Sequence, residues 1–312
     1  MDKKVYKTPD ELITILRDER KLTVSQPLRA KRLLLENNYY SITANKDLFY
    51  EKGVRQYKKG VEFEQLYAIY YFDKLFKTTI LKHLLMIEQK IKTAISDHIS
   101  KRYGYKDRDY LKLQNYDQSS QYLNDTINKI KGQMADYGSK NRCVHHYQVT
   151  YGYVPFWVLS KCLTMGVIRD YFQILKPSDQ DVIAKQILEK EIKTHSVKKL
   201  KVMIALITDI RNMCAHDELL IGYKHGRLYL SPLEEHKLLK LKNPNNPKEG
   251  RNDLLALLIT IKYLVNKTTY HMFMEQITSL INRYYSKIKN VVTLKEFLNY
   301  IGLTENYQLL DN

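Results

Sequence analysis

The sequence predicts an all-α fold, and three of its features support that prediction. Glycine and proline, the residues that most often interrupt helices, occur only 11 and 7 times in 312 residues. Apolar residues recur at steps of three and four, the spacing that lines one face of a helix. Patterns typical of helix starts stand before several of these stretches. One exception is expected, a minor β-hairpin at residues 221–230 around a Lys-His-Gly-Arg turn.

The N-terminal residues predict two short helices. Thr8, Pro9 and Glu11 combine an N-cap, a first-turn proline and an acid at the third helical position. Ser25 with Pro27 opens the second helix. A helix-turn-helix is an alternative for this pair, but it lacks a clear recognition-helix pattern. We therefore expect a small helical cap.

The cap is expected to cover residues 1–60 and a helical domain residues 61–312, and the two could form one continuous domain. The strongest helical pattern covers residues 61–102, and its unusual length predicts a break near residues 72–78. Other helices are expected at residues 119–137, 155–166, 167–175, 179–191, 196–216, 252–289 and 293–302. Loops are expected at residues 139–155 and 240–251.

The charge favours a polyanionic partner. The chain has 51 Lys and Arg against 34 Asp and Glu, a formal net charge of +17. Such an excess is typical of nucleic-acid binding, although biased codon usage would also enrich lysine. The positions we expect to contact RNA are in two basic runs, most often solvated faces in proteins. They are Lys198, Lys199, Lys201, Lys240 and Lys242.

The cysteines and the apolar runs indicate a cytoplasmic protein with no membrane segment. Three scattered cysteines do not predict a disulfide framework. Met1 leads into a charged run rather than a signal sequence, and no uncharged apolar run is long enough to span a membrane. Cys143, His145 and His146 lack the second pair of ligands typical of a zinc site. We therefore expect no metal and no cofactor.

One segment near the end of a predicted helix carries chemistry. Residues 209–216 contain the pattern Arg-Asn-x-x-Ala-His, formed by Arg211, Asn212 and His216. A histidine titrates near neutrality, so it can take the proton of a ribose 2′-hydroxyl or protonate the leaving 5′-oxygen. An arginine stays charged and can stabilise the phosphate in the transition state, while the asparagine orients a neighbouring group. The pattern resembles the signature of HEPN domains, many of which are metal-independent ribonucleases.

One histidine cannot be acid and base at the same instant. HEPN proteins pair two motifs across an interface, so the resemblance implies a homodimer with a composite site. The spacing adds a condition, because positions five apart differ by about 140° around a helix. Arg211 and His216 converge only if the helix is distorted, if it ends near His216, or if subunits share the site. The alternative is a structural helix end, where Arg211 binds a carboxylate and His216 caps carbonyls.

Further blocks precede this motif in a fixed order. They are Gln26-Pro27-Leu28, Asn38-Tyr39-Tyr40-Ser41, Phe63-Glu64-Gln65-Leu66-Tyr67, Phe72-Asp73-Lys74-Leu75, Ile87-Glu88 with Lys92, Tyr103-Gly104, His146-Tyr147, Tyr151-Gly152 and Pro155-Phe156-Trp157-Val158. Together with the motif, over roughly residues 25–217, they resemble the abortive-infection family of the AbiD/AbiF type. Asp217 and Glu218 depart from the family pattern, and such acids would favour a charged His216 but repel phosphate if they faced the site.

The resemblance implies a HEPN-like bundle and an anti-phage toxin. Such an effector would cut host or phage RNA as a metal-independent endoribonuclease, restrained by a partner RNA as in a toxin–antitoxin pair. The alternative is a non-catalytic RNA-binding protein of a phage-defence ribonucleoprotein. Glu88 and Lys92 are spaced as a helix-supporting ion pair, but Glu88 could instead bind Arg211. Cys214 is expected to pack inward rather than act as a nucleophile.

Overall fold

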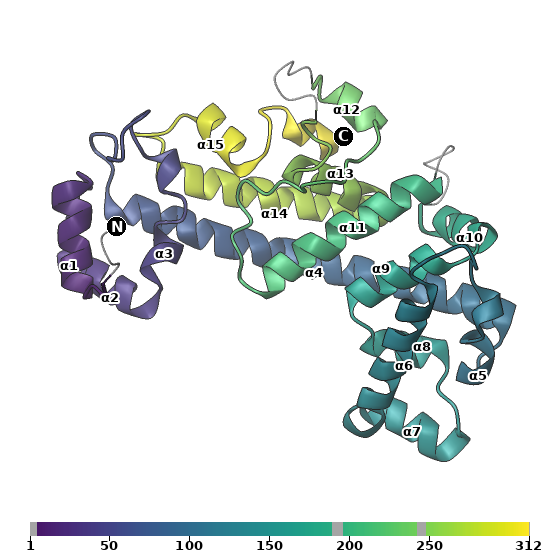
Figure 1. Cartoon of the computed structure of the whole chain (residues 1–312). Helices are drawn as coiled ribbons and strands as arrows, with labels where there is room; N and C mark the ends of the chain where they lie inside the picture. The colour runs from purple at the N-terminus through teal and green to yellow at the C-terminus, as the bar shows by residue number, and fades with distance from the viewer. Residues whose placement is uncertain (1–4, 189–195, 242–247, 312) are drawn as a thin grey trace.

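The protein is a helical bundle built around one long helix (Figure 1). The computed structural model describes residues 5–188, 196–241 and 248–311. The α-helices are α1 (Pro9–Thr14), α2 (Pro27–Glu36), α3 (Tyr39–Ile42), α4 (Phe63–Tyr103), α5 (Asp107–Tyr110), α6 (Leu123–Lys140), α7 (Arg142–Tyr151), α8 (Phe156–Cys162), α9 (Met165–Ile174), α10 (Pro177–Leu188), α11 (Ser196–Ala215), α12 (Glu234–Leu238), α13 (Leu254–Leu264), α14 (Lys267–Tyr285) and α15 (Leu294–Ile301). The all-α prediction is confirmed, since no β-strand occurs within these ranges.

The central helix α4 is 41 residues long and unbroken. At 1.5 Å per residue it extends over roughly 60 Å. Its predicted apolar stripe is buried, from Ile80 to Ile99. The predicted break near residues 72–78 is wrong, because α4 contains no glycine or proline and packs along its length against α14, α10, α11 and α8.

The N-terminal helix starts as the sequence predicts. Thr8 and Glu11 form a capping box, in which the Thr8 N–H donates to the Glu11 carboxylate at 2.7 Å and the Glu11 N–H donates to Thr8 Oγ1 at 3.3 Å. Buried hydrophobic residues form one cluster that runs from Ile13 to Leu310 and includes both the predicted cap and the predicted domain. The predicted boundary between a cap and a domain near residue 60 stays a prediction, because one shared core does not locate such a boundary.

The predicted hairpin at residues 221–230 is wrong. Its backbone pairs with the segment that precedes α13 rather than with itself. The N–H groups of His225 and Leu230 donate to the carbonyls of Asn252 and Arg251, both at 2.6 Å. The side chains of Asn252 and Arg251 donate back to the carbonyls of His225 and Leu230, both at 2.7 Å. These long-range bonds replace the ladder that a hairpin would need.

Other boundaries also differ from the prediction. The helix expected at 252–289 is split into α13 and α14, because the Asn266 side chain accepts from the Thr269 N–H at 2.8 Å and caps a new helix. The loop expected at 139–155 contains α7 instead. Asn141 caps that helix, and Gly152, in the left-handed conformation, ends it.

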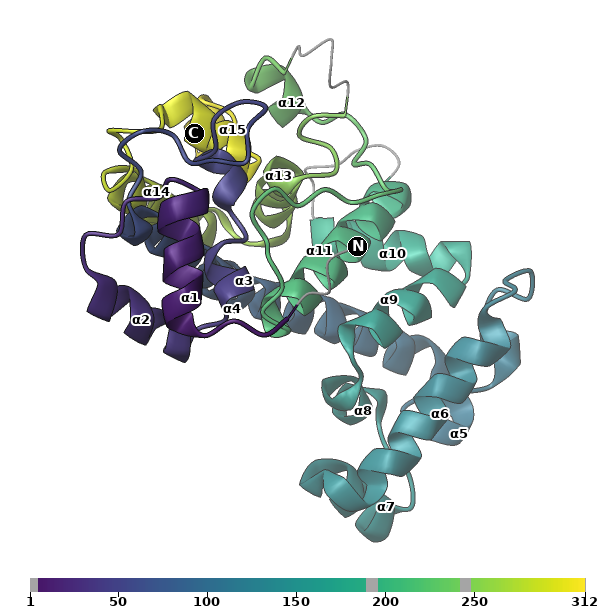
Figure 2. The ribbon, with the colours of Figure 1, turned by 60° about the vertical axis from the view of Figure 1, so that its left-hand side comes forward.

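The helices α6 and α7 project from the rest of the bundle as a lobe (Figure 2). They pack against each other, and α6 also packs against α8 and α9. The lobe therefore joins the body on the side of α8. Across the described ranges, no helix combines the length and the apolar character needed to cross a membrane.

Candidate active site at the end of α11

The core face of α11 fixes where the motif lies. Met203, Leu206, Ile207 and Ile210 are buried, as the helical spacing predicts. The next residue, Arg211, is partly buried. All residues from Met203 to Thr208 are buried, so the core surrounds this part of α11 on every side. The motif thus begins where α11 leaves the core.

α11 ends immediately before His216. The last helical residue is Ala215, and the His216 N–H donates to the Asn212 carbonyl at 2.9 Å. Asp217 has a positive φ of 56°, and the Glu218 N–H closes the turn on the Met213 carbonyl at 3.0 Å. One condition for Arg211 and His216 to converge, a helix that ends near His216, is therefore met.

The side chains of Asn212 and His216 are exposed. Among the described residues neither makes a side-chain hydrogen bond or an ion pair, and no bond joins His216 to Arg211. The structural alternative required His216 to cap carbonyls, and its ring does not do so in the described structure. The imidazole is thus accessible to a ligand.

Arg211 is held by an acid on the central helix. Its Nε lies 3.3 Å from Glu88 Oε2, and the other oxygen of Glu88 binds Lys92 Nζ at 2.7 Å. The side chains of Glu88 and Lys92 are only 11% and 6% exposed, whereas that of Arg211 is 30% exposed. Lys92 also donates to the Leu163 carbonyl at 2.7 Å, which ties α4 to the end of α8.

The geometry leaves the terminal nitrogens of Arg211 available. Glu88 engages only Nε, and no hydrogen bond within the described chain uses the Nη atoms. A guanidinium oriented through Nε can still present its two Nη groups to a phosphate. Glu88 therefore holds the Arg211 guanidinium from the Nε side. The predicted alternative contact between Glu88 and Arg211 is present together with the Glu88–Lys92 pair.

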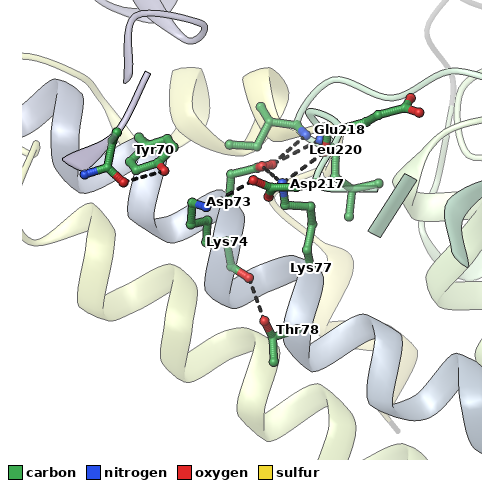
Figure 3. Close-up of polar contacts among 10 residues, drawn as sticks. Tyr70, Asp73, Lys74, Lys77, Thr78, Asp217, Glu218 and Leu220 are labelled. Atoms are coloured by element: carbon green, nitrogen blue, oxygen red, sulfur yellow. Dashed lines mark hydrogen bonds and ion pairs between the residues drawn. The ribbon is translucent and has the colours of Figure 1, made fainter. Parts of the chain in front are cut away.

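A second network fixes the turn that follows His216 (Figure 3). Lys77 Nζ binds the Asp217 carboxylate at 2.7 Å, the Glu218 carbonyl at 3.0 Å and Asp73 at 2.9 Å. Lys74 binds the other oxygen of Asp217 at 3.0 Å. Asp217 is thus directed at two lysines of α4, and they neutralise its charge.

Asp73 anchors the backbone beyond this turn. Its carboxylate accepts the N–H groups of Leu220 and Ile221, both at 3.1 Å. Asp73 and Lys77 are both buried. Two acid–lysine pairs on α4, each spaced by four residues, therefore hold the end of α11, one at Arg211 and one after His216.

Asp217 is expected to stabilise the fold in a pH-dependent way. Hydrogen bonds from Lys77 and then Lys74 lower the pKa of its carboxyl below the ordinary value of 3.8. A lowered folded-state pKa gives stability that is present above the unfolded pKa and is lost as the pH falls through the folded one. We expect Asp217→Asn, which tolerates the same left-handed backbone, to be less stable than wild type at neutral pH.

Urea unfolding across a pH series checks this expectation. The difference in the free energy of unfolding between wild type and Asp217→Asn should shrink at pH values below 3.8. A difference that stays constant down to the lowest pH would show that the carboxylate does not contribute through its charge.

The family match covers this whole arrangement. The model of the Abi-like proteins matches residues 32–222, more than half of the chain. The chain belongs to the Abi-like protein family. This match confirms the abortive-infection family predicted from the ordered blocks, and the matched region contains Glu88, Lys92, Arg211, His216 and Asp217. No curated protein and no solved structure matches the chain.

The basic residues predicted to contact RNA do not gather at the motif of this Abi-like protein. Lys198 is exposed and Lys199 and Lys201 are partly buried at the start of α11, and burial lowers the pKa of Lys201. Lys198 lies thirteen residues before Arg211, which separates the two by roughly 20 Å along the helix. Lys240 is exposed, and Lys242 lies outside the described residues. Their contact with RNA stays a prediction.

Two other candidates come from the sequence, the thiol of Cys214 and a metal site. Cys214 is partly buried, and burial raises the pKa of its thiol to about 12, so the reactive thiolate is scarce at neutral pH. The described residues contain no cluster of three or more His, Cys, Asp or Glu placed to hold a metal ion. Asp73, Lys74 and Lys77 were not predicted as site residues. The sequence pattern that could have revealed them is the four-residue spacing of Asp73 and Lys77, which Glu88 and Lys92 share.

Proposed function

We propose that this Abi-like protein is an abortive-infection effector that cuts RNA by internal transesterification. Family membership supports the broad role in phage defence. One observation supports the chemistry: at the end of α11, Glu88 holds Arg211 through Nε alone, beside a turn that leaves His216 exposed. The end of α11 therefore carries both a guanidinium that can bind a phosphate and an imidazole that can transfer a proton.

The proposed reaction uses the RNA as its own nucleophile. His216 accepts the proton of a ribose 2′-hydroxyl, and the 2′-oxygen attacks the adjacent phosphorus. The bond to the 5′-oxygen breaks, which leaves a 2′,3′-cyclic phosphate and, after protonation, a 5′-hydroxyl. The Nη groups of Arg211 stabilise the negative charge that builds on the phosphate, and Asn212 orients a neighbouring group. His216 accepts the proton and Arg211 stabilises the charge, so the proposal includes no metal and no cofactor.

The second proton transfer requires a second group. We propose that another copy of the chain supplies its own His216, so that a homodimer forms a composite site with an acid and a base. A partner RNA that occupies this site before infection would keep the toxin inactive. The net charge of +17 is compatible with binding such an RNA.

The Arg211–Glu88 contact also favours a second candidate function. In that case Arg211 is structural, and the protein binds RNA in a phage-defence ribonucleoprotein without cutting it. Cleavage assays separate the two candidates.

The proposed reaction predicts how the substrate must be built. Purified protein with EDTA is expected to cut a labelled RNA and to leave 2′,3′-cyclic phosphate ends. The same RNA with a single 2′-deoxynucleotide at the cleaved position should resist cutting there, because the attacking oxygen is absent. Gel analysis of end-labelled products measures both effects. Cutting at the deoxy position, or complete inhibition by EDTA, would overturn the mechanism.

A further inference from the structure

A second surface of the molecule combines exposed aromatic rings with basic side chains. It lies where the projecting lobe meets the end of α4, and we call it the aromatic surface. Its exposed rings are Tyr105, Tyr151 and Trp157, which are 47%, 54% and 44% exposed. Large aromatic side chains are seldom left in water in such a group without a binding role.

The rings of this surface contact one another in series. The centroids of Tyr105 and Tyr153 are 5.5 Å apart, and those of Tyr153 and Tyr151 are 6.2 Å apart. Tyr151 then contacts Tyr147 at 5.3 Å and His146 at 5.7 Å. The first ring follows α4, while His146, Tyr147 and Tyr151 belong to α7 and Tyr153 follows it. The series therefore bridges two elements, with neighbouring rings tilted or edge-on to one another.

A pocket adjoins these rings between α4 and α8. It has a volume of about 520 Å³, and its lining includes Tyr105, Trp157, Lys101 and Lys161. It extends along α4 to Gln89, the residue after Glu88, which binds Arg211. The pocket therefore runs along one face of α4 from Lys101 to Gln89.

The charge of this region indicates the kind of partner. The pocket lining contains Lys101, Lys161 and one acid, Asp97, which binds Lys101 at 2.8 Å. Lys106 Nζ lies 5.8 Å from the ring centre of Tyr105 and 5.7 Å from that of Tyr153. The cores of protein–protein interfaces are depleted in lysine, whereas aromatic rings among cations are typical of surfaces that bind unpaired nucleic acid.

We propose that the aromatic surface binds a single-stranded stretch of RNA. Bases stack on Tyr151 and Trp157, while Lys106 and Lys161 neutralise phosphates. Duplex RNA binds poorly, because its bases are stacked on one another and cannot lie on the rings. The inference rests on the proposed function in that it takes RNA as the ligand, but it concerns binding and not cleavage.

The test measures fluorescence anisotropy with a labelled single-stranded oligouridine and with a duplex RNA of equal length. It uses His216→Ala protein, which is expected to bind RNA without cutting it. Adding Tyr151→Ala or Trp157→Ala should weaken single-strand binding about tenfold each, because one stacked base is lost. Tyr151→Phe keeps the ring and should bind normally. Tyr6→Ala removes a tyrosine that is exposed outside this surface and should have no effect.

The outcomes separate the inference from the proposed function. Weaker binding by both alanine variants, together with preference for the single strand, supports the aromatic surface whether or not the protein cuts RNA. Unchanged binding by both variants, or equal affinity for the duplex, overturns it. Loss of self-association with unchanged RNA binding would overturn it too, because the surface would then be a protein interface.

Discussion

Replacing His216 with alanine is expected to slow RNA cleavage by about 100-fold to 10,000-fold, the usual contribution of a positioned proton carrier. The side chain is exposed and makes no hydrogen bond within the described structure, so its removal should not disturb the fold. The loss should therefore appear in the cleavage rate and not in stability or RNA affinity. Single-turnover rates on labelled RNA, with anisotropy and thermal unfolding alongside, measure all three.

A matched control uses a histidine far from the motif. His271 on α14 is also exposed, and it binds Asp311 at 2.9 Å. His271→Ala should cut RNA at the wild-type rate. If His216→Ala cut as fast as His271→Ala, His216 would have no part in the reaction.

Replacing Asp73 with alanine is expected to lower the free energy of unfolding by about 3 kcal/mol, because it leaves two buried N–H groups without an acceptor and removes one of the two acids that bind the buried Lys77. Asp73 binds Lys77 and accepts two backbone N–H groups of the segment after α11. The same change should release the turn that follows His216, so cleavage should fall as well. Urea unfolding and the cleavage assay measure the two effects.

The same helix provides the control for this prediction. Asp97 and Lys101 form an ion pair with the same four-residue spacing, but both side chains are exposed. Asp97→Ala should cost less than about 1 kcal/mol, because water replaces an exposed partner. Equal costs for Asp73→Ala and Asp97→Ala would contradict the anchoring role of Asp73.

Local patterns in the sequence predicted much of the fold. The buried stripe of α4 follows from the spacing of its isoleucines, and the start of α1 follows from Thr8 and Glu11. The errors arose where a single side chain or a distant partner decides the structure. Asn266 splits the predicted C-terminal helix, and bonds to residues 251–252 replace the predicted hairpin. Apolar periodicity contains neither kind of information.

The candidate site was predicted in part for the same reason. Arg211, Asn212 and His216 are close in sequence, so a short motif reveals them. The contact of Glu88 with Arg211 joins residues 123 positions apart, and it was predicted only as one alternative. The pairing of Lys77 with Asp217 joins residues 140 positions apart and was not predicted. The fold alone brings these charges together.

The most direct test of the central claim is a cleavage assay on labelled RNA with EDTA. It compares wild type with Arg211→Ala and His216→Ala, with RNA binding measured in parallel. We expect wild type to cut the RNA and leave 2′,3′-cyclic phosphate ends, and both variants to bind RNA without cutting it. Wild-type protein that binds RNA tightly and never cuts it would contradict the account and support an RNA-binding protein without catalysis.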